Sequence, residues 1–349
     1  MPRPELSDRE RRVLEAVIQS YVETAEPAGS RNIARRFGLG VSPATIRNTM
    51  SDLEEKGFLY HPHTSAGRVP TDLAYRIYVD SLTRKASATA AETGRLTDEL
   101  SGVGPSSTIA TILRRAAQSL SVVSQELGVA LGPRLDHAVL QRLELTRLSH
   151  ERLLLVLTLQ AGGVRTIFVE VGGQIADSAI AEVAHVLNER LAGLSLADIR
   201  TTLASRVRDS AQSRDAHELL NVFVQEGDVL FDVPLVPDDD GVVLGQTSVL
   251  AEQPEFASGD NMRRLIALTD RQEQLAEMLR RRSESSGISI TIGNEHADPR
   301  MEHLTLVTAS YHAGPLSGVI GVIGPTRMPY EKVIALVRHA SQLVSEVLQ

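Results

Sequence analysis

The sequence predicts a multidomain α+β protein, and three observations support that prediction. The chain has 349 residues, which is enough for two or three domains at ~100–200 residues each. Apolar residues make up 42% of the chain and charged residues 23%, so there is ample material for packed cores. Strand–helix–strand patterns lie on both sides of a middle segment whose residue pattern is different. This arrangement favours an α+β domain interrupted by an insertion.

Composition excludes several classes of site. The chain contains no cysteine, which excludes disulfides, thiolate nucleophiles and cysteine-bearing zinc or iron–sulfur centres. The longest nearly unbroken apolar run, Leu153–Leu159, is far shorter than the ~18 residues of a membrane helix. The start of the chain carries charges where a signal peptide has an apolar core. We therefore expect a cytoplasmic protein with no membrane segment.

Residues 1–85 differ in charge and composition from the remainder of the chain. They carry 13 Lys and Arg against 11 Asp and Glu, whereas the remaining residues carry 23 against 33. Half of all Phe and Tyr residues also lie there. Because large side chains help to fill the core of a small domain, we predict a compact domain over residues 1–85.

Two helices are expected at the start of this domain. Ser7 and Glu10 form a capping-box pattern, which predicts a helix that begins directly after Ser7. One apolar stripe at helical spacing follows, formed by Val13, Leu14, Val17, Ile18, Tyr21 and Val22. A short second helix is predicted to begin at Gly29-Ser30 and to end at Gly38.

A third helix is predicted between Ser42, as its N-cap, and Gly57, which stops it. Ile46, Met50 and Leu53 recur at helical spacing and should face the core. The opposite face then carries short polar side chains and one cation near the amino end: Ala44, Thr45, Arg47, Asn48 and Ser51. The carboxyl half is acidic and would repel phosphates. Such a helix would enter a DNA groove by its first turns, as a helix-turn-helix recognition helix does.

A strand–turn–strand pattern over residues 58–70 follows the third helix directly. The predicted tip, Thr64–Gly67, and the adjacent Arg68 offer small hydroxyls and a cation. A hairpin in this position is a wing, suited to contact with phosphates or the minor groove. Thr71 should cap a further helix.

The remainder of the chain is divided by pattern into a linker, a split domain and an insertion. We predict a linker at 86–104, an α+β domain over 105–192 and 284–349, and an inserted segment with a return helix at 193–283. The expected elements are helices at 106–127, 180–191, within 194–225, at 261–283 and 330–348, and strands at 138–145, 152–159, 164–171, 288–292, 304–311 and 318–323.

Several runs together resemble the family of the heat-inducible transcription repressor HrcA. They are Glu26–Arg31, Ser42–Asn48, Pro62–Thr71, Pro254–Phe256, and Gly318–Met328 followed by Tyr330. The resemblance covers almost the whole chain. It departs at Ala25, where a glycine is expected, and at Ala28, where a larger apolar residue is usual.

The resemblance implies an architecture and a function. The expected fold is an N-terminal winged helix-turn-helix followed by a GAF-like domain that is interrupted by an inserted dimerisation segment. The expected function is negative regulation of chaperone operons in the heat-shock response, without enzymatic activity. A homodimer would bind double-stranded DNA at an inverted-repeat operator called CIRCE, and its activity would depend on the GroE chaperonin and be lost on heat stress.

The expected DNA contacts follow from the third helix, the start of the second helix and the hairpin. Arg47 and Asn48 are the best candidates for base edges, since Arg suits guanine and Asn suits adenine; which of them reads bases stays open. Ser30, Arg31 and Arg68 are expected on phosphates. The complete predicted set is Ser30, Arg31, Ser42, Ala44, Thr45, Arg47, Asn48, Ser51, His63, Thr64, Ser65 and Arg68.

No cofactor or metal is expected, because the residue patterns that could bind one are incomplete. His61 and His63 have no carboxylate or third histidine nearby in sequence to complete a metal site, and a DNA contact is the better reading of His63. The run Asp238–Asp240 lacks the alternating ligands of a calcium loop. The glycines of 318–325 lack the lysine and hydroxyl of a phosphate loop, which favours a closely packed strand.

Two questions stay open at this point. Arg327 and Tyr330 could close the sheet onto the last helix or could belong to a regulatory surface. The chain could also be a winged-helix regulator that senses a small molecule through its GAF-like domain. A concave apolar pocket with convergent polar groups in 105–192 and 284–345 would favour that alternative.

Overall fold

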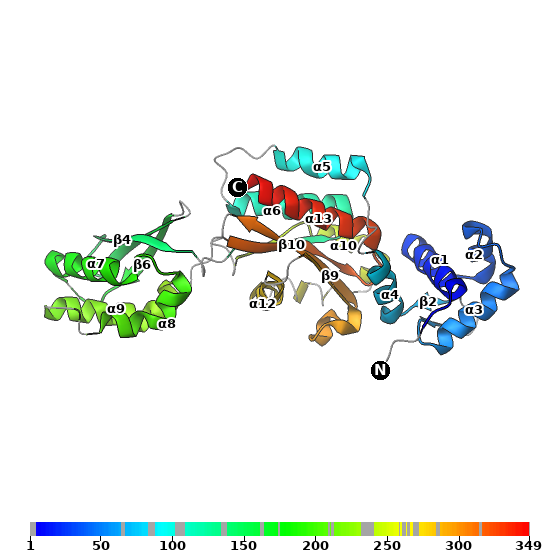
Figure 1. Cartoon of the computed structure of the whole chain (residues 1–349), viewed down its shortest axis with the longest axis horizontal. Helices are drawn as coiled ribbons and strands as arrows, with labels where there is room; N and C mark the ends of the chain where they lie inside the picture. Colours follow the sequence, from blue (N-terminus) through cyan, green and yellow to red (C-terminus); the bar gives the residue numbers. More distant parts are fainter. Residues whose placement is uncertain are drawn as a thin grey trace. The chain divides into compact units, whose positions relative to one another are not determined.

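The computed structural model describes residues 5–63, 67–82, 88–101, 109–133, 138–160, 164–173, 175–208, 210, 213–231, 241–257, 259, 263, 266–267, 272–283, 287–313 and 316–348. Predicted contacts Thr64 and Ser65, and the acidic turn at 238–240, lie outside these residues. The chain divides into two compact units: a first unit of Met1–Leu131, Val242–Tyr311 and Val319–Val347, and a second unit of Gly132–Gly241, His312–Gly318 and Leu348–Gln349. The predicted mixture of helices and sheets is confirmed (Figure 1).

The amino-terminal part of the first unit consists of short helices and one hairpin. Its elements are α1 (Asp8–Thr24), α2 (Ser30–Phe37), α3 (Pro43–Glu55), β1 (Leu59–Tyr60), β2 (Val69–Pro70) and α4 (Asp72–Leu82). Strands β1 and β2 pair antiparallel, with Tyr60 opposite Val69. The core between the helices is apolar and fully buried, and includes Val17, Ile18, Ile33, Ile46, Leu53 and Phe58.

Local signals explain where these helices begin and end. The Ser7 side chain accepts from the Glu10 amide, and Glu10 reaches back to the Ser7 amide, so the predicted capping box is present. Ser42 accepts from the Thr45 amide at 3.1 Å and starts α3. Ala25 ends α1 with φ of 55°, a left-handed conformation that favours glycine. This conformation is the physical reason why a glycine is expected there.

A five-stranded sheet forms the centre of the first unit. Its order is β7 (Val242–Leu244), β3 (Leu127–Leu131), β10 (Leu316–Pro325), β9 (Leu304–Ala313) and β8 (Ile288–Ile292). Helices α6 (Ile109–Ser124) and α13 (Tyr330–Val347) cover one face, with α5 (Ala90–Ser101) against both. Helix α12 (Gln272–Ser283) lies against the other face and contacts β3 and β7; in Figure 1 it lies below the β10 label. Two short elements, α10 (Ser248–Ala251) and η3 (Pro254–Phe256), follow β7.

Glycines allow close approach at this sheet. A Cβ on Gly128 of β3 would lie 1.9 Å from the Ala117 carbonyl oxygen of α6, so only glycine lets this helix rest on the strand. A Cβ on Gly321 of β10 would lie 2.1 Å from the Val307 oxygen. The glycine run of 318–325 is therefore a buried strand of the sheet, as predicted.

The second unit contains a three-stranded antiparallel sheet and three helices. Strands β4 (Leu140–Arg147), β5 (Arg152–Leu159) and β6 (Val164–Glu170) lie in that order. They pack with α7 (Asp177–Leu191), α8 (Leu196–Val207) and α9 (Arg214–Leu230) around one apolar core. On the outer face of the sheet, Val164 and Phe168 are 59% and 64% exposed.

The unit boundaries differ from those expected from sequence. The sequence pattern places boundaries at 192/193 and 283/284, whereas the chain passes between the two units at 131/132, 241/242, 311/312, 318/319 and 347/348. Strands β4–β6 form a sheet of their own, and the apolar faces of α8 and α9 are buried against it. Residues 242–257 and 272–283 instead pack in the first unit. Strand runs of similar length and hydrophobicity do not reveal which sheet they join.

Candidate nucleic-acid interface and its attachment to the sheet

Helix α3 presents the polar face that the sequence predicts. Its core side chains Ile46, Met50 and Leu53 are 0%, 3% and 0% exposed, so the rotation of the helix is fixed. The opposite side chains at its amino end lie in solvent: Ser42, Ala44, Arg47 and Asn48 are exposed, and Thr45 and Ser51 are half-buried. The exposed set therefore lies at the N-cap and on the first two turns of the helix.

Helix α3 is fixed to α1 near its carboxyl end. The Lys56 ammonium donates to Glu10 Oε1 at 2.7 Å and to the Glu5 carbonyl oxygen at 3.3 Å. The hydrogen bond from Lys56, together with those from Ser7, lowers the pKa of Glu10 to about 2. At the other end, the Ser42 hydroxyl is occupied by the amide and hydroxyl of Thr45. Ser42 therefore serves as a cap that orders the first turn.

Arg47 is the exposed cation of this face. Its side chain lies in solvent and forms no ion pair with any of the residues that the structure describes. It stands beside Asn48 in the amino-terminal half of α3, where the helix dipole is positive. Arg31 is likewise exposed, in the first turn of α2, and Ser30 beside it is half-buried. Arg47 and Arg31 are thus exposed cations in the amino-terminal halves of their helices, where the helix dipole is positive.

Arg68 is placed differently from the expectation of a free phosphate contact. Its side chain is only 13% exposed and pairs with Glu54 Oε2 at 2.7 Å, with Ser51 Oγ at 3.5 Å. Its backbone pairs with Ala28 through hydrogen bonds of 2.8 and 2.9 Å. The guanidinium is thus neutralised within the protein, and Arg68 joins the hairpin to α3 and to the loop before α2. The sequence does not predict this ion pair, because Glu54 lies 14 positions before Arg68 and no local pattern joins the two.

The two hairpin histidines have separate roles. His61 Nδ1 contacts Glu54 Oε1 at 2.9 Å, so Glu54 holds both His61 and Arg68. His63 is exposed. Among the residues that the structure describes, no three His, Asp or Glu side chains lie together as a potential metal site.

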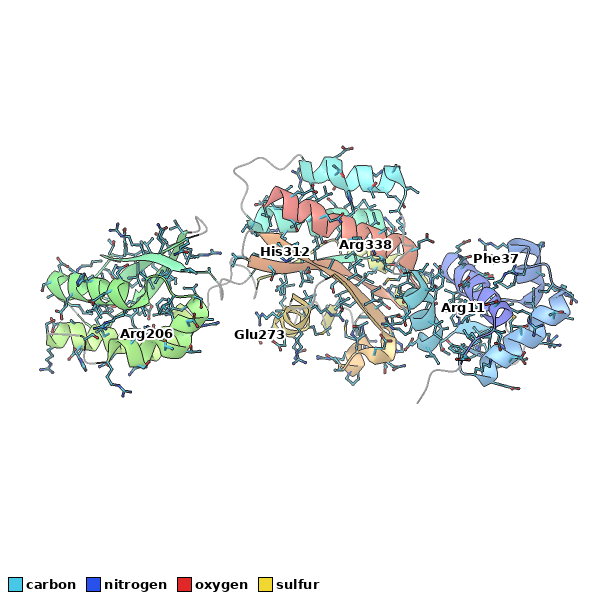
Figure 2. All side chains as sticks on the ribbon, viewed as in Figure 1. Arg11, Phe37, Arg206, Glu273, His312 and Arg338 are labelled. Carbon is cyan, nitrogen blue, oxygen red and sulfur yellow. The ribbon has the colours of Figure 1, made fainter. Side chains whose placement is uncertain are left out.

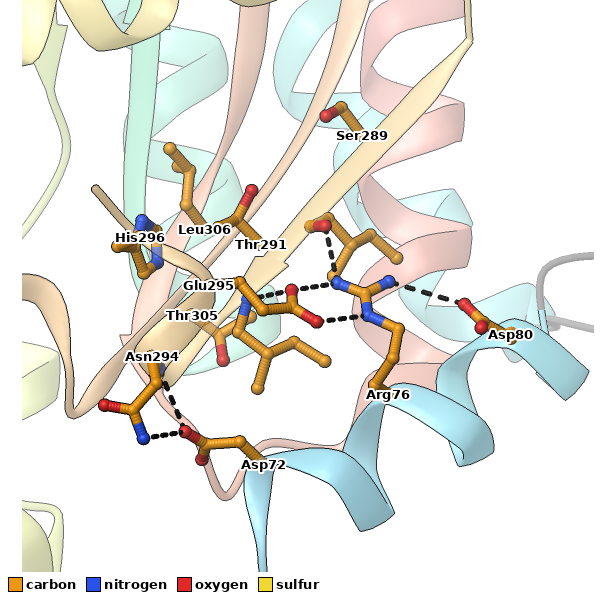
Figure 3. A network of polar contacts seen from close by, with 12 residues as sticks. Asp72, Arg76, Asp80, Ser289, Thr291, Asn294, Glu295, His296, Thr305 and Leu306 are labelled. Carbon is orange, nitrogen blue, oxygen red and sulfur yellow. Dashed lines mark hydrogen bonds and ion pairs between the residues drawn. The ribbon is translucent and has the colours of Figure 1, made fainter. Parts of the chain in front are cut away.

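A polar network attaches α4 to the sheet, and sequence reasoning did not identify it. Arg76 of α4 donates to Glu295 Oε1 at 2.7 Å and to the Ile290 carbonyl oxygen at 2.8 Å (Figure 3). The hydrogen bond to Glu295 raises the pKa of Arg76. Asp72 accepts from the Asn294 amide and from its side chain, both at 2.9 Å. The start of α4 is therefore held at the end of β8.

Arg327 provides a second attachment, this time to α1. Its guanidinium forms two hydrogen bonds to the Glu255 carboxylate and one of 2.6 Å to the Val22 carbonyl oxygen. Nearby, the rings of Tyr75 and Tyr330 lie 5.6 Å apart. The runs 254–256 and 318–330, which carry part of the resemblance, thus meet α1 and α4. Arg327 and Tyr330 are joined to the DNA-binding candidate and also close the sheet onto α13.

Comparisons with known proteins identify relatives of this chain over almost its whole length. A family model described as the HrcA protein C-terminal domain matches residues 110–334. The chain is 40% identical over 353 residues to the heat-inducible transcription repressor HrcA of Chlorobium phaeobacteroides strain BS1, with 99% of each chain covered. The chain belongs to the HrcA family. This is a family of transcription repressors and not of enzymes.

Further relatives extend over the same length. The HrcA repressors of Geobacter sulfurreducens and Chlorobium chlorochromatii are 38% and 37% identical, with 99% of this chain and 99% and 98% of theirs covered. A crystal structure of a hypothetical protein, solved at 2.2 Å, aligns with a TM-score of 0.62 at 20% identity over 99% of both chains. That likeness shows a common fold. No helix within the described ranges has the length and apolarity to cross a membrane.

Proposed function

We propose that this HrcA-family chain represses transcription of heat-shock genes by binding DNA through α3 and the β1–β2 hairpin, which together form a winged helix. The observation that carries the proposal is the exposed amino-terminal half of α3, where Arg47 stands free of carboxylates of the described chain. Guanidinium and amide side chains read guanine and adenine edges in the major groove. Arg47 and Asn48 are the proposed base readers.

Charge along α3 supports one orientation in the groove. The positive end of the helix dipole and Arg47 lie at the amino end, whereas Asp52 and Glu55 are exposed near the carboxyl end. Phosphates repel the acidic end, so only the first turns enter the groove. Glu54 does not add its full charge to this repulsion, because the Arg68 guanidinium forms an ion pair with it.

The proposed contacts then divide by role. Ala44, Thr45, Arg47 and Asn48 face the bases, and Ser30 and Arg31 face the backbone. His63, Thr64 and Ser65 of the hairpin contact phosphates or the minor groove. Ser42, Ser51 and Arg68 also position α3 and the hairpin, because their polar atoms have partners within the protein, as the Thr45 hydroxyl does through Ser42.

We propose further that the chain acts as a homodimer on the inverted-repeat CIRCE operator. Two α3 helices related by a two-fold axis read two half-sites, so operator symmetry follows protein symmetry. The five-stranded sheet with α6 and α13 is the proposed GAF-like domain, and the second unit is the proposed dimerisation insertion. Its exposed Val164 and Phe168 lie on the same face of β6 and support that role, because large exposed apolar side chains that share a face mark interaction surfaces.

Regulation by the GroE chaperonin is proposed on the family resemblance. In this proposal the chain works in the cytoplasm, and the chaperonin maintains a marginally stable DNA-binding state. Heat stress withdraws the chaperonin by occupying it with unfolded proteins. Stability of only a few kcal/mol makes such a state sensitive to the loss of a partner.

Binding of the full-length protein to an inverted-repeat duplex tests the proposal. Gel-shift titrations compare the inverted repeat with a duplex of the same composition and scrambled half-sites, at fixed salt. We expect tighter binding to the inverted repeat by at least ~10³-fold, which is the lower range for specific DNA binding. Equal affinity for the two duplexes would contradict the DNA-reading role. Titrations after mild heating, with and without chaperonin, test the regulatory part.

A further inference from the structure

A groove of about 570 Å³ lies between α12 and β8, in the first unit. Its wall includes Met278 and Arg282 from α12, Ser289 and Thr291 from β8, and His296 and Ala297 after β8. This volume falls within the range of small-molecule sites. We propose that the groove binds a small organic anion, whose carboxylate or phosphate group is held by the Arg282 guanidinium.

Arg282 is a half-buried cation whose protein partners are all neutral. Its Nη1 donates to the Ser289 oxygens at 3.4 and 3.3 Å, the Leu306 carbonyl oxygen at 3.5 Å and Thr308 Oγ1 at 3.4 Å. These are long, weak hydrogen bonds. Its Nη2 donates to Thr291 Oγ1. No carboxylate of the described chain forms an ion pair with it.

Most carboxylates along the groove form ion pairs with other arginines. Glu295 is held by Arg76, Asp298 by Arg300, and Glu277 by Arg281. Glu273 is the remaining acidic side chain of the wall, and it is exposed at the rim. The charge of Arg282 is therefore left without a counter-ion inside the groove.

Burial makes this charge costly. Burial lowers the pKa of Arg282 to about 10, so the group remains cationic at neutral pH. A partly buried cation without an anion is unfavourable, and an oxyanion is the group that a guanidinium binds in bidentate geometry. Met278 and Ala297 provide an apolar wall for the rest of the molecule. The combination favours a small organic anion over a bare hydrophobic ligand.

His296 provides a natural reporter of occupancy. Burial, and then the nearby charge of Arg282, lower the pKa of this imidazole. An anion bound at Arg282 offsets that charge, so it raises the pKa of His296. This shift is independent of any DNA-binding activity, and the proposal therefore stands or falls separately from the proposed repressor function.

The test is a titration of the full-length protein with inorganic phosphate and with succinate, at constant ionic strength in chloride. Proton NMR follows the His296 ring signal, which is assigned by its loss in His296→Asn. We expect saturable binding and an upward shift of the His296 pKa. The effect should be lost in Arg282→Gln and in Ala297→Glu, which places a carboxylate in the exposed wall.

Arg206→Gln is the matched control. It also removes one arginine, from an exposed site on α8 (Figure 2), and should leave the titration unchanged. Circular dichroism checks the fold of each variant, and Ala297→Glu keeps the test valid if Arg282→Gln unfolds. Absence of saturation in the wild type, or equal saturation in Ala297→Glu, would overturn the proposal.

Discussion

The Arg327 guanidinium donates to the Val22 carbonyl oxygen at 2.6 Å and thereby ties the last turn of α1 to the strand end of the sheet. Helix carbonyls at this end have no intrahelical partner and carry a partial negative charge. The same guanidinium holds Glu255 through two hydrogen bonds. One side chain thus joins the DNA-binding candidate to two distant segments of the chain.

Removal of this attachment should weaken the first unit. In Arg327→Gln, the Val22 carbonyl and the Glu255 carboxylate lose their cationic partner, and we expect a loss of about 1–3 kcal/mol in the free energy of unfolding. Urea unfolding measures it. Glu255→Gln and the double variant complete a double-mutant cycle. Additive effects of the two substitutions would show that the pair is not coupled.

The proposed base reader is tested by one substitution. In Arg47→Ala, the duplex loses a guanidinium contact, and we expect selectivity for the operator to fall by about 1–3 kcal/mol. Because the side chain is exposed, thermal stability should not change. Arg206→Ala serves as the charge-matched control, and gel-shift titrations provide the measurement. Unchanged operator affinity in Arg47→Ala would exclude this residue as a reader.

Glu126 makes stability depend on pH. Its side chain is buried at 2% exposure, and burial raises the pKa of its carboxyl well above the usual value. Because the pKa is raised in the folded state, the contribution of the protonated Glu126 carboxyl to the free energy of unfolding is complete below the unfolded pKa of ~4.3. This contribution is lost as pH rises through the folded pKa. Glu126→Gln should therefore be more stable than wild type at neutral and alkaline pH, and similar to it near pH 4.

Glu92 serves as a control, because its pKa is shifted in the opposite direction from that of Glu126. The hydrogen bond from Lys332, together with those from Thr89, lowers the pKa of Glu92 to about 2. The contribution of the ionised Glu92 carboxylate to the free energy of unfolding is present above the unfolded pKa and is lost as pH falls toward 2. Glu92→Gln should therefore be less stable than wild type at pH 7. Urea unfolding between pH 4 and 8 separates the two cases, and parallel profiles for both variants would refute the assignment.

The dimerisation proposal is tested on the outer face of the β4–β6 sheet. Phe168 is 64% exposed opposite Leu154, so Phe168→Asp should leave the unit folded and yield monomers in sedimentation experiments. Ala204→Asp, at an exposed site of α8, is the control. Deletion of about 195–245 is a poorer test, because it removes Leu203 and Phe223 from the core. A dimer that persists in Phe168→Asp would place the interface elsewhere.

Ala25 offers a stabilising substitution. Its φ of 55° lies in the left-handed region, which costs a residue with a Cβ about 1 kcal/mol relative to glycine. Part of the gain from Ala25→Gly is offset by the greater freedom of glycine in the unfolded chain. We expect a net gain below ~1 kcal/mol, seen as a higher melting temperature. A lower melting temperature would show that strain at Ala25 is absent.

Local elements could be predicted from sequence because their signals lie within a few residues. The Ser7–Glu10 capping box, the Ser42 N-cap and Gly38 at the end of α2 each act over one helical turn. The face of α3 followed from the same spacing rule. These features define the shape of the DNA-binding candidate, and all of them are present in the structure.

Elements that depend on distant partners could not be predicted. Strand β3 follows α6 so closely that its apolar residues continue the helical pattern; the break at Gln125, with φ of 63°, has no sequence signal. Helix α5 has few large apolar residues and resembles a linker. Arg76 and Glu295 are 219 positions apart, and no local pattern pairs them. The same holds for Arg68 and Glu54, whose ion pair changes the role of Arg68.

Strands β3 and β7 are neighbours, with Leu131 opposite Val242, and the next residues, Gly132 and Gly241, share a hydrogen bond of 2.8 Å. The 132–241 segment thus leaves and rejoins the sheet at a single rung of the ladder, much as a tight turn would. The length of this segment adds little to the free-energy cost of forming the sheet, since the entropy lost on closing a loop rises only slowly with loop length. A change in the length of this segment therefore leaves the connectivity of the sheet that carries it unaltered.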